Sequence, residues 1–113
     1  MAFVLSNKPT FWFRVEVKRP DDKGGWASFT FQAEFRRRTR PEIDDMIKAG
    51  ALQKGDDDLL GTELVGWKDV SDAEGKPLEV NAANCTLLLA EPHVQSAIAR
   101  AWLEASITGP AKN

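Results

Sequence analysis

Cysteine and histidine are almost absent from this chain, which has one of each among its 113 residues. The lone Cys85 excludes an internal disulfide framework and is typical of a protein in a reducing compartment. A structural zinc site needs several thiolate or imidazole ligands, so Cys85 and His93 alone predict no zinc site. No apolar run approaches the ~18–20 residues of a membrane span, and the first residues lack the basic-then-apolar form of a signal peptide. We therefore expect a soluble cytoplasmic protein that does not contact the membrane.

Recognisable catalytic motifs are also missing. The sequence has no phosphate-binding glycine loop, dinucleotide fingerprint, serine nucleophile elbow or zinc-protease motif. His93 falls at an expected helix start, where a partly exposed histidine without a catalytic duty is expected. Cys85 precedes a Leu-rich run and is expected to act as a small core hydrophobe. The sequence thus predicts no catalytic residue and no cofactor, and we expect a protein that is not an enzyme.

Three consecutive aspartates, Asp56 to Asp58, raise the question of a calcium site. An EF-hand loop needs alternating oxygen ligands, a glycine in the middle and a glutamate at its end. The aspartates lack that spacing and precede a Leu-rich segment. We expect them to stabilise a helix start, where the macrodipole favours negative charge. No metal site is predicted.

The length and composition of the chain are typical of one globular domain. A chain of 113 residues with 42% hydrophobic and 28% charged residues predicts a single domain over residues 1–113. The net charge of −2 disfavours a general nucleic-acid binder, which usually has a basic surface.

Alternating apolar residues predict an antiparallel β-hairpin over residues 10–36, with a turn at 19–25 (RPDDKGG). The apolar face of this hairpin consists of Phe11, Phe13, Val15, Val17, Ala27, Phe29, Phe31, Ala33 and Phe35. A two-stranded hairpin is marginal alone, so this face needs a cover. The run Phe3-Val4-Leu5 is a candidate for a further edge strand.

The opposite face of the hairpin is polar except for Trp12 and Trp26. Two interpretations stay open for these indoles. They could pack as a cross-strand pair, which typically contributes ~0.2–1 kcal/mol. Alternatively, they could anchor a partner, because tryptophan is enriched at binding hot spots.

Helical signals dominate the second half of the chain. Strands precede helices, so we predict an α+β fold in which the N-terminal hairpin or small sheet packs against about four short helices in residues 39–107. Residues 108–113 are predicted to form a loose tail after Gly109-Pro110.

The first two helices are predicted from their ends. The segment Thr39-Arg40-Pro41-Glu42 has the form of a capping box, and Gly50 can end the helix that it starts. From Asp58 the spacing of Leu60, Leu64 and Trp67 predicts a second short helix, ended by Gly66.

The last two helices have clearer signals. Asn81 predicts the start of a third helix through Leu89, and Pro92 suits the first turn of a fourth. An amphipathic stripe in the fourth helix consists of Val94, Ala97, Ile98, Ala101, Trp102 and Ala105. We expect this stripe to cover the phenylalanine face of the hairpin, with Trp102 as a structural anchor.

Trp67 is the second predicted anchor. It lies in the segment GWKDVSDAEGKPLEV (66–80), just before a polar turn at Asp72 to Gly75. We expect its indole to be buried and to fix the exit of the chain from the core.

Four arginines, Arg36, Arg37, Arg38 and Arg40, follow the second predicted strand. Such a basic strip could clamp phosphates. With Trp12 and Trp26 it would form a platform for single-stranded nucleic acid. An acidic protein partner would use the same arginines equally well, and the acidic chain as a whole favours the protein partner.

The order of these elements resembles that of the tail assembly chaperones of long-tailed bacteriophages and prophages. The matching segments are the Phe-rich strand running into basic residues (29–38), the Gly-Trp with an Asp/Val pair (65–70), the Asp-x-x-Gly turn with Pro-Leu (72–78), and the helix introduced by Pro-x-Val (92–104). The resemblance covers about residues 10–107. The chain departs from the pattern at Glu79-Val80, where an apolar residue is expected.

The resemblance implies a non-enzymatic role in virion assembly. Such a chaperone binds the tape-measure protein, helps to recruit tail-tube subunits, and is absent from the finished virion. Family members are often made in two lengths, the longer one by ribosomal frameshifting, and this chain would match the short form. The resemblance carries over no catalytic residue, and it leaves the oligomeric state open, including a homo-oligomer.

The predicted partner-binding residues are therefore Trp12, Trp26, Arg36, Arg37, Arg38 and Arg40. The alternatives are a small nucleic-acid-binding module that uses Arg36–Arg40, and another tail structural or connector protein of a phage.

Overall fold

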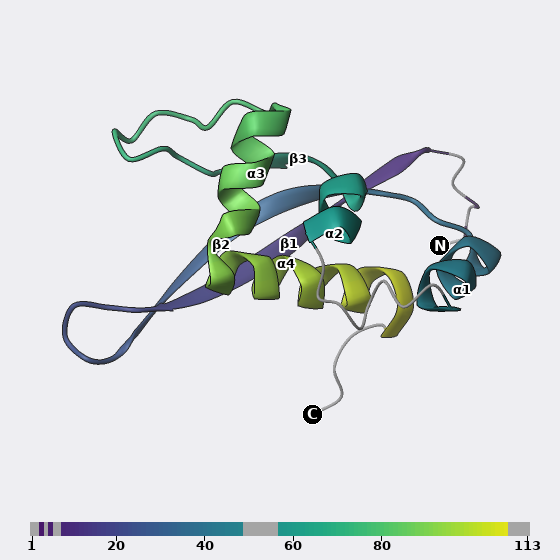
Figure 1. The fold of residues 1–113 in the computed structure, drawn as a ribbon, viewed down its shortest axis with the longest axis horizontal. Coiled ribbons are helices and arrows are strands. Elements are labelled where there is room, and N and C mark those ends of the chain that lie inside the picture. Colours follow the sequence, from purple (N-terminus) through teal and green to yellow (C-terminus); the bar gives the residue numbers. More distant parts are fainter. Residues whose placement is uncertain (1–2, 4, 6–7, 49–56, 109–113) are drawn as a thin grey trace.

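The computed structural model describes residues 3, 5, 8–48 and 57–108 and has the expected α+β architecture. Its elements are β1 (Thr10–Pro20), β2 (Trp26–Arg36), α1 (Arg40–Lys48), α2 (Asp57–Glu63), β3 (Leu64–Lys68), α3 (Ala82–Ala90), α4 (Pro92–Leu103) and a π-helical turn, η1 (Glu104–Thr108). Helices α2, α3 and α4 lie together in front of the sheet in Figure 1. The predictions for Val4, Gly50, Asp56 and residues 109–113 lie outside the described residues.

The three strands form one antiparallel sheet in the order β1-β2-β3. The predicted hairpin is confirmed, with Phe11 opposite Phe35. Trp12 lies opposite Glu34 and Trp26 opposite Pro20, at the two ends of the hairpin. The cross-strand Trp12–Trp26 pair is therefore wrong, because the register separates the two indoles along the strands. Phe3 and Leu5 are not in a strand.

The core lies between the apolar face of the sheet and the helices. Its buried residues are Val15, Val17, Phe31, Ala33, Phe35, Leu60, Leu64, Trp67, Leu89, Ala97, Ile98, Ala101 and Trp102. The stripe of α4 covers the phenylalanine face, as predicted. Phe29 lies beyond this cover and is half exposed. The core thus fills the middle of the hairpin and leaves its turn end open.

The segment 64–68 is a strand, so the prediction of a second helix through Trp67 and ending at Gly66 is wrong. Helix α2 ends at Glu63, and β3 pairs with β2 through Gln32–Lys68 and Glu34–Gly66. A β-carbon on Gly66 would lie 2.9 Å from Oε1 of Glu34. Glycine leaves room here for the Glu34 side chain, whose carboxylate end would have to shift for a larger residue. Tertiary pairing along β2 thus overrides a helix-like spacing.

The predicted helix starts are confirmed by their hydrogen bonds. The backbone N–H of Thr39 donates to Oε1 of Glu42 (2.9 Å), which completes the capping box of α1. The N–H of Asn84 donates to Oδ1 of Asn81 (2.8 Å) at the start of α3. Pro92 occupies the first turn of α4.

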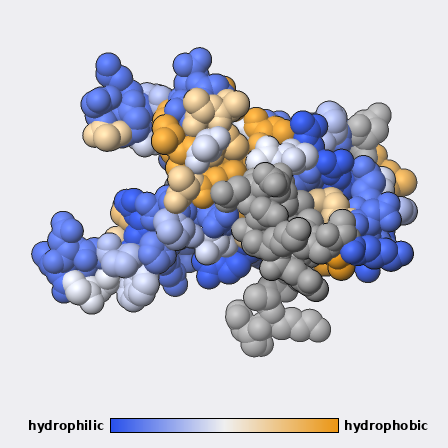
Figure 2. Space-filling view, in the orientation of Figure 1, coloured by the Kyte–Doolittle hydropathy of each residue, from blue (hydrophilic) through white to orange (hydrophobic). Residues whose placement is uncertain are grey.

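Two projections extend from the turn end of the sheet. One is the β1-β2 hairpin, and the other is the loop between β3 and α3 (Figure 1). The loop contains the predicted turn, in which Gly75 has φ of 81° and its N–H donates to the carbonyl of Asp72 (3.0 Å). Figure 2 shows both projections as hydrophilic arms with a notch between them.

Candidate interaction surface

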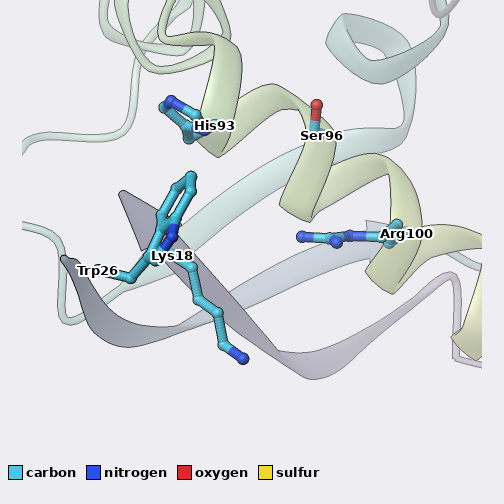
Figure 3. A pocket seen from close by; sticks show the side chains of 5 residues that line it. All are labelled: Lys18, Trp26, His93, Ser96 and Arg100. Atoms are coloured by element: carbon cyan, nitrogen blue, oxygen red, sulfur yellow. The ribbon is translucent and has the colours of Figure 1, made fainter. Parts of the chain in front are cut away.

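A groove lies where the turn end of the hairpin meets α4. It has a volume of about 350 Å³ and is lined by Lys18, Trp26, His93, Ser96 and Arg100. Figure 3 shows Trp26 reaching from the hairpin toward His93 at the start of α4. The two elements that build this groove are far apart in the sequence, so the tertiary fold creates it.

Trp26 is the most exposed aromatic residue of the groove, with 66% of its surface accessible. Its ring meets the His93 imidazole edge-on, with centroids 5.9 Å apart and planes at 82°. This geometry is favourable for aromatic pairs and holds the indole beside the groove. His93 is partly exposed, as predicted for a histidine at a helix start.

The groove continues along the outer side of β1. A second cavity of about 280 Å³ shares Lys18 and Arg100 with it and is otherwise lined by Arg14, Glu16, Ala97, Ala101 and Glu104. Lys18 Nζ lies 3.8 Å from Glu16 Oε1. Arg100 has no ion pair within the part of the chain that the structure describes. The groove therefore offers an exposed indole beside a cation without a charge partner, which suits an acidic segment with apolar side chains.

Trp12 lies near the opposite end of the hairpin, across from Glu34. Its ring is covered by the Lys68 ammonium group, which lies 4.3 Å from the ring centroid. This cation–π contact holds the indole against β3. The structure therefore places Trp12 and Trp26 in separate surroundings, and only Trp26 borders the groove.

The basic strip is tied into the fold at every arginine. Three of its guanidinium groups donate through Nε, from Arg36 to the Thr62 carbonyl (2.8 Å), from Arg37 to the Lys8 carbonyl (3.1 Å), and from Arg40 to Asp44 Oδ1 (3.0 Å). These three side chains are exposed, so they keep free surface for a partner.

Arg38 is the exception within the strip. It donates to both carboxylate oxygens of the fully buried Glu63, from Nε (2.8 Å) and from Nη2 (2.7 Å). Its Nη1 also lies 3.2 Å from Glu42 Oε2. The hydrogen bond to Glu63 is the main cause that raises the pKa of Arg38. This bidentate pair is a structural contact, because buried charges need such compensation.

Both predicted anchors are buried. Trp67 donates from Nε1 to the carbonyl of Leu78 (3.0 Å), which joins β3 to the far end of the loop. Trp102 is buried in the core, and its Nε1 has no hydrogen-bond partner among the described residues. Trp67 thus connects the loop to the sheet, while Trp102 contributes through apolar contact alone.

No sequence pattern indicates that Trp26 has Lys18, His93, Ser96 and Arg100 as its neighbours. The hairpin and α4 were each predicted, but their relative placement has no local sequence signal. The feature of the sequence that indicated a binding surface at the turn end was Trp26.

The described residues offer few side chains for metal binding or thiol chemistry. The described part of the chain contains no group of three or more histidine, cysteine or carboxylate side chains that could hold a metal ion. Cys85 is partly buried, and desolvation raises the pKa of its thiol. In the same part of the chain, no helix has the length and apolar character needed to cross a membrane.

The four segments that carry the resemblance occupy connected parts of the fold. They form β2 with its basic end, β3, the loop that follows β3, and α4. Three of them meet around the core through Phe35, Trp67 and Trp102. No protein-family model, curated protein or solved structure matches this chain.

Proposed function

We propose that this chain is a non-enzymatic assembly chaperone of the phage tail type, acting in the cytoplasm of a bacterial host. Its partner would be the tape-measure protein, which it keeps soluble while tail-tube subunits are recruited. The ordered resemblance of residues 10–107 supports this proposal, and the groove beside Trp26 supports a role in binding protein.

The observation that carries the binding role is the exposed indole of Trp26 at a cationic groove. A tryptophan that is 66% exposed has a large apolar surface to bury on a partner. Lys18 and Arg100 flank it, and Arg100 lacks an ion pair among the described residues. A helical segment with an apolar stripe and neighbouring carboxylates has the chemistry to fill this groove.

The proposal is tested by co-expressing the chain with a tape-measure fragment from the same phage genome. The soluble yield of the fragment is measured with and without the chain, and affinity is measured by calorimetry. We expect Trp26→Ala to weaken binding about tenfold or more, the loss typical of a hot-spot residue. Arg100→Glu should weaken binding and reduce its salt dependence.

Leu87→Ala is the matched control, because Leu87 is 67% exposed but lies on α3 outside the groove. It should bind the fragment like the unmodified chain. If the chain leaves the fragment insoluble, the chaperone proposal fails. If the fragment is kept soluble but Trp26→Ala and Leu87→Ala behave alike, the groove is not the binding surface.

The alternative nucleic-acid function of Arg36–Arg40 has weaker support, because the net charge of the chain is −2 and Arg38 is bound by the buried Glu63. A gel shift at low salt that is lost on changing Arg36, Arg37 and Arg40 to Glu would favour it. A stable ring that remains in purified particles would favour a connector protein.

A further inference from the structure

Half of β2 has an unpaired edge. Strand β3 pairs with β2 at Gln32–Phe35, and the chain then leaves the sheet at Asp69, which has φ of 67°. The next residue, Val70, accepts a hydrogen bond from the Leu78 N–H (2.8 Å) within the loop. Strand β3 therefore does not continue past Lys68, and the edge of β2 at Trp26–Thr30 has no neighbouring strand.

The backbone groups on this edge can be assigned from the register. In an antiparallel sheet, successive residues point their N–H and C=O alternately to the two neighbouring strands. The Arg37 N–H donates to Pro9 O and the Asp21 N–H to Gly25 O, so odd-numbered residues of β2 bond to β1. The N–H and C=O of Trp26, Ser28 and Thr30 therefore point to the vacated side. No described residue bonds to them there.

An apolar groove runs beside this open edge, on the helix side of the sheet. Its volume is about 190 Å³, and its apolar lining comes from Val17, Phe29, Phe31, Val70, Leu88 and Val94. Phe29 is 49% exposed although it lies on the core face. An added strand would satisfy the free backbone groups and cover Phe29 in one step.

The chain itself carries a segment with the chemistry of such a strand. Phe3 and Leu5 are 88% and 86% exposed, more than any other large hydrophobic side chain in the described residues. They alternate within the sequence AFVLS (2–6), so in a strand both would point to the same face. Two such side chains on one face of a strand offer apolar surface that another molecule could cover.

The segment cannot reach the open edge of its own chain. Strand β1 begins at Thr10 opposite Arg36, and Ser28 lies eight residues further along β2, about 26 Å away at 3.3 Å per residue. Leu5 precedes Thr10 by five residues, which span at most about 18 Å. Pairing of the whole segment with Trp26–Thr30 therefore needs a second copy of the chain.

We propose that residues 2–6 of one copy add as a β-strand to the open edge of β2, Trp26–Thr30, in a second copy. Phe3 and Leu5 enter the groove between Phe29 and Leu88. The donor segment and the acceptor edge are different surfaces, so the contact is heterologous and produces a reciprocal pair, a ring or an open chain of copies. This proposal does not rest on the chaperone function, and the two can fail separately.

The test measures molecular mass over a concentration series by light scattering and sedimentation. The full chain should reach a mass of two or more copies as its concentration rises. Phe3→Asp/Leu5→Asp removes the donor, and Ser28→Pro removes one outward N–H from the acceptor edge while leaving the bonds to β1 intact. Both variants should stay monomeric at concentrations about tenfold higher.

Glu16→Pro is the matched control, because Glu16 also points its N–H outward, but from the free edge of β1. It should associate like the unmodified chain, and circular dichroism should show that all variants are folded. A labelled peptide of residues 1–8 (MAFVLSNK) should bind the full-length Phe3→Asp/Leu5→Asp variant. Its binding should be lost when Ser28→Pro is added.

Three results would overturn the proposal. The first is that the full chain stays monomeric and that the Phe3→Asp/Leu5→Asp variant also fails to bind the peptide. The second is association that persists in both variants, which would place the contact on another surface. The third is association that depends on Phe3 and Leu5 but not on Ser28, which would mean that the segment docks elsewhere.

Discussion

Arg38 holds the buried carboxylate of Glu63 through two parallel hydrogen bonds of 2.8 and 2.7 Å. Glu63 is the last residue of α2, and Arg38 follows the end of β2. The pair therefore joins the end of the hairpin to the point where α2 turns into β3. A basic strip that looks like a binding motif in the sequence thus contains one arginine with a structural duty.

Arg38→Met should lower the free energy of unfolding by about 3 kcal/mol, because it leaves the Glu63 carboxylate buried without a partner. Urea denaturation measures this change. The double variant Arg38→Met/Glu63→Leu should recover most of the loss, since it removes both charges. Equal stability of the single variant and the unmodified chain would show that Glu63 finds another partner.

Trp67→Ala should cost roughly 3–5 kcal/mol of unfolding free energy, because it empties a buried site between β3 and the loop. Trp67→Phe keeps much of the apolar contact and loses the hydrogen bond to Leu78, so its loss should be smaller. Thermal and urea unfolding of the two variants provide the comparison. Similar losses in both would assign the main role of Trp67 to its hydrogen bond.

Gly66→Ala should destabilise the sheet by about 1 kcal/mol. The new methyl group would push aside the Glu34 carboxylate, whose Oε2 accepts a hydrogen bond from Thr10 Oγ1 (2.7 Å). In a Glu34→Ala background the same change should be neutral or stabilising, because the obstacle is gone. Urea denaturation of this double-mutant cycle measures the coupling, and additive effects would contradict the close approach of Glu34 to Gly66.

The start of α1 should weaken in acid. Hydrogen bonds from the Thr39 backbone N–H, the Thr39 hydroxyl and Arg38 lower the pKa of Glu42. A lowered pKa stabilises the fold above the ordinary glutamate value of about 4.3, and this contribution is lost as the pH falls through the lowered pKa. An NMR titration should place the Glu42 carboxyl below that value.

Glu42→Gln is the control for this pH dependence, because its amide oxygen can still accept from Thr39. Amide exchange in α1 should respond less to acid in this variant than in the unmodified chain. An unchanged acid response would assign the effect to another carboxylate.

The parts of the fold that could be predicted have local causes. Alternation predicted β1 and β2, the Thr39–Glu42 capping box predicted the start of α1, and the Asn81 cap predicted α3. The stripe of α4 also predicted its contact with the hairpin, because an amphipathic face must be buried somewhere. In each case the deciding residues lie within one or two turns of each other.

The features that the sequence did not predict depend on residues far apart in the chain. The segment Leu64–Trp67 has helical spacing, yet β2 recruits it as a strand. The separation of Trp12 from Trp26 follows from the register, and the placement of Trp26 and Arg100 beside one groove follows from the position of α4. No local sequence pattern predicts these three features, because contacts between distant parts of the chain determine them.

The direct passage from α2 into β3 has a consequence for the order of folding. A short turn joins β1 and β2, whereas the pairing of Gln32 with Lys68 must close a much longer loop. We expect the hairpin to form early and β3 to join later, as the slower step. Because Arg38 holds Glu63 immediately before β3, docking of α2 would bring the late strand to its partner already in register.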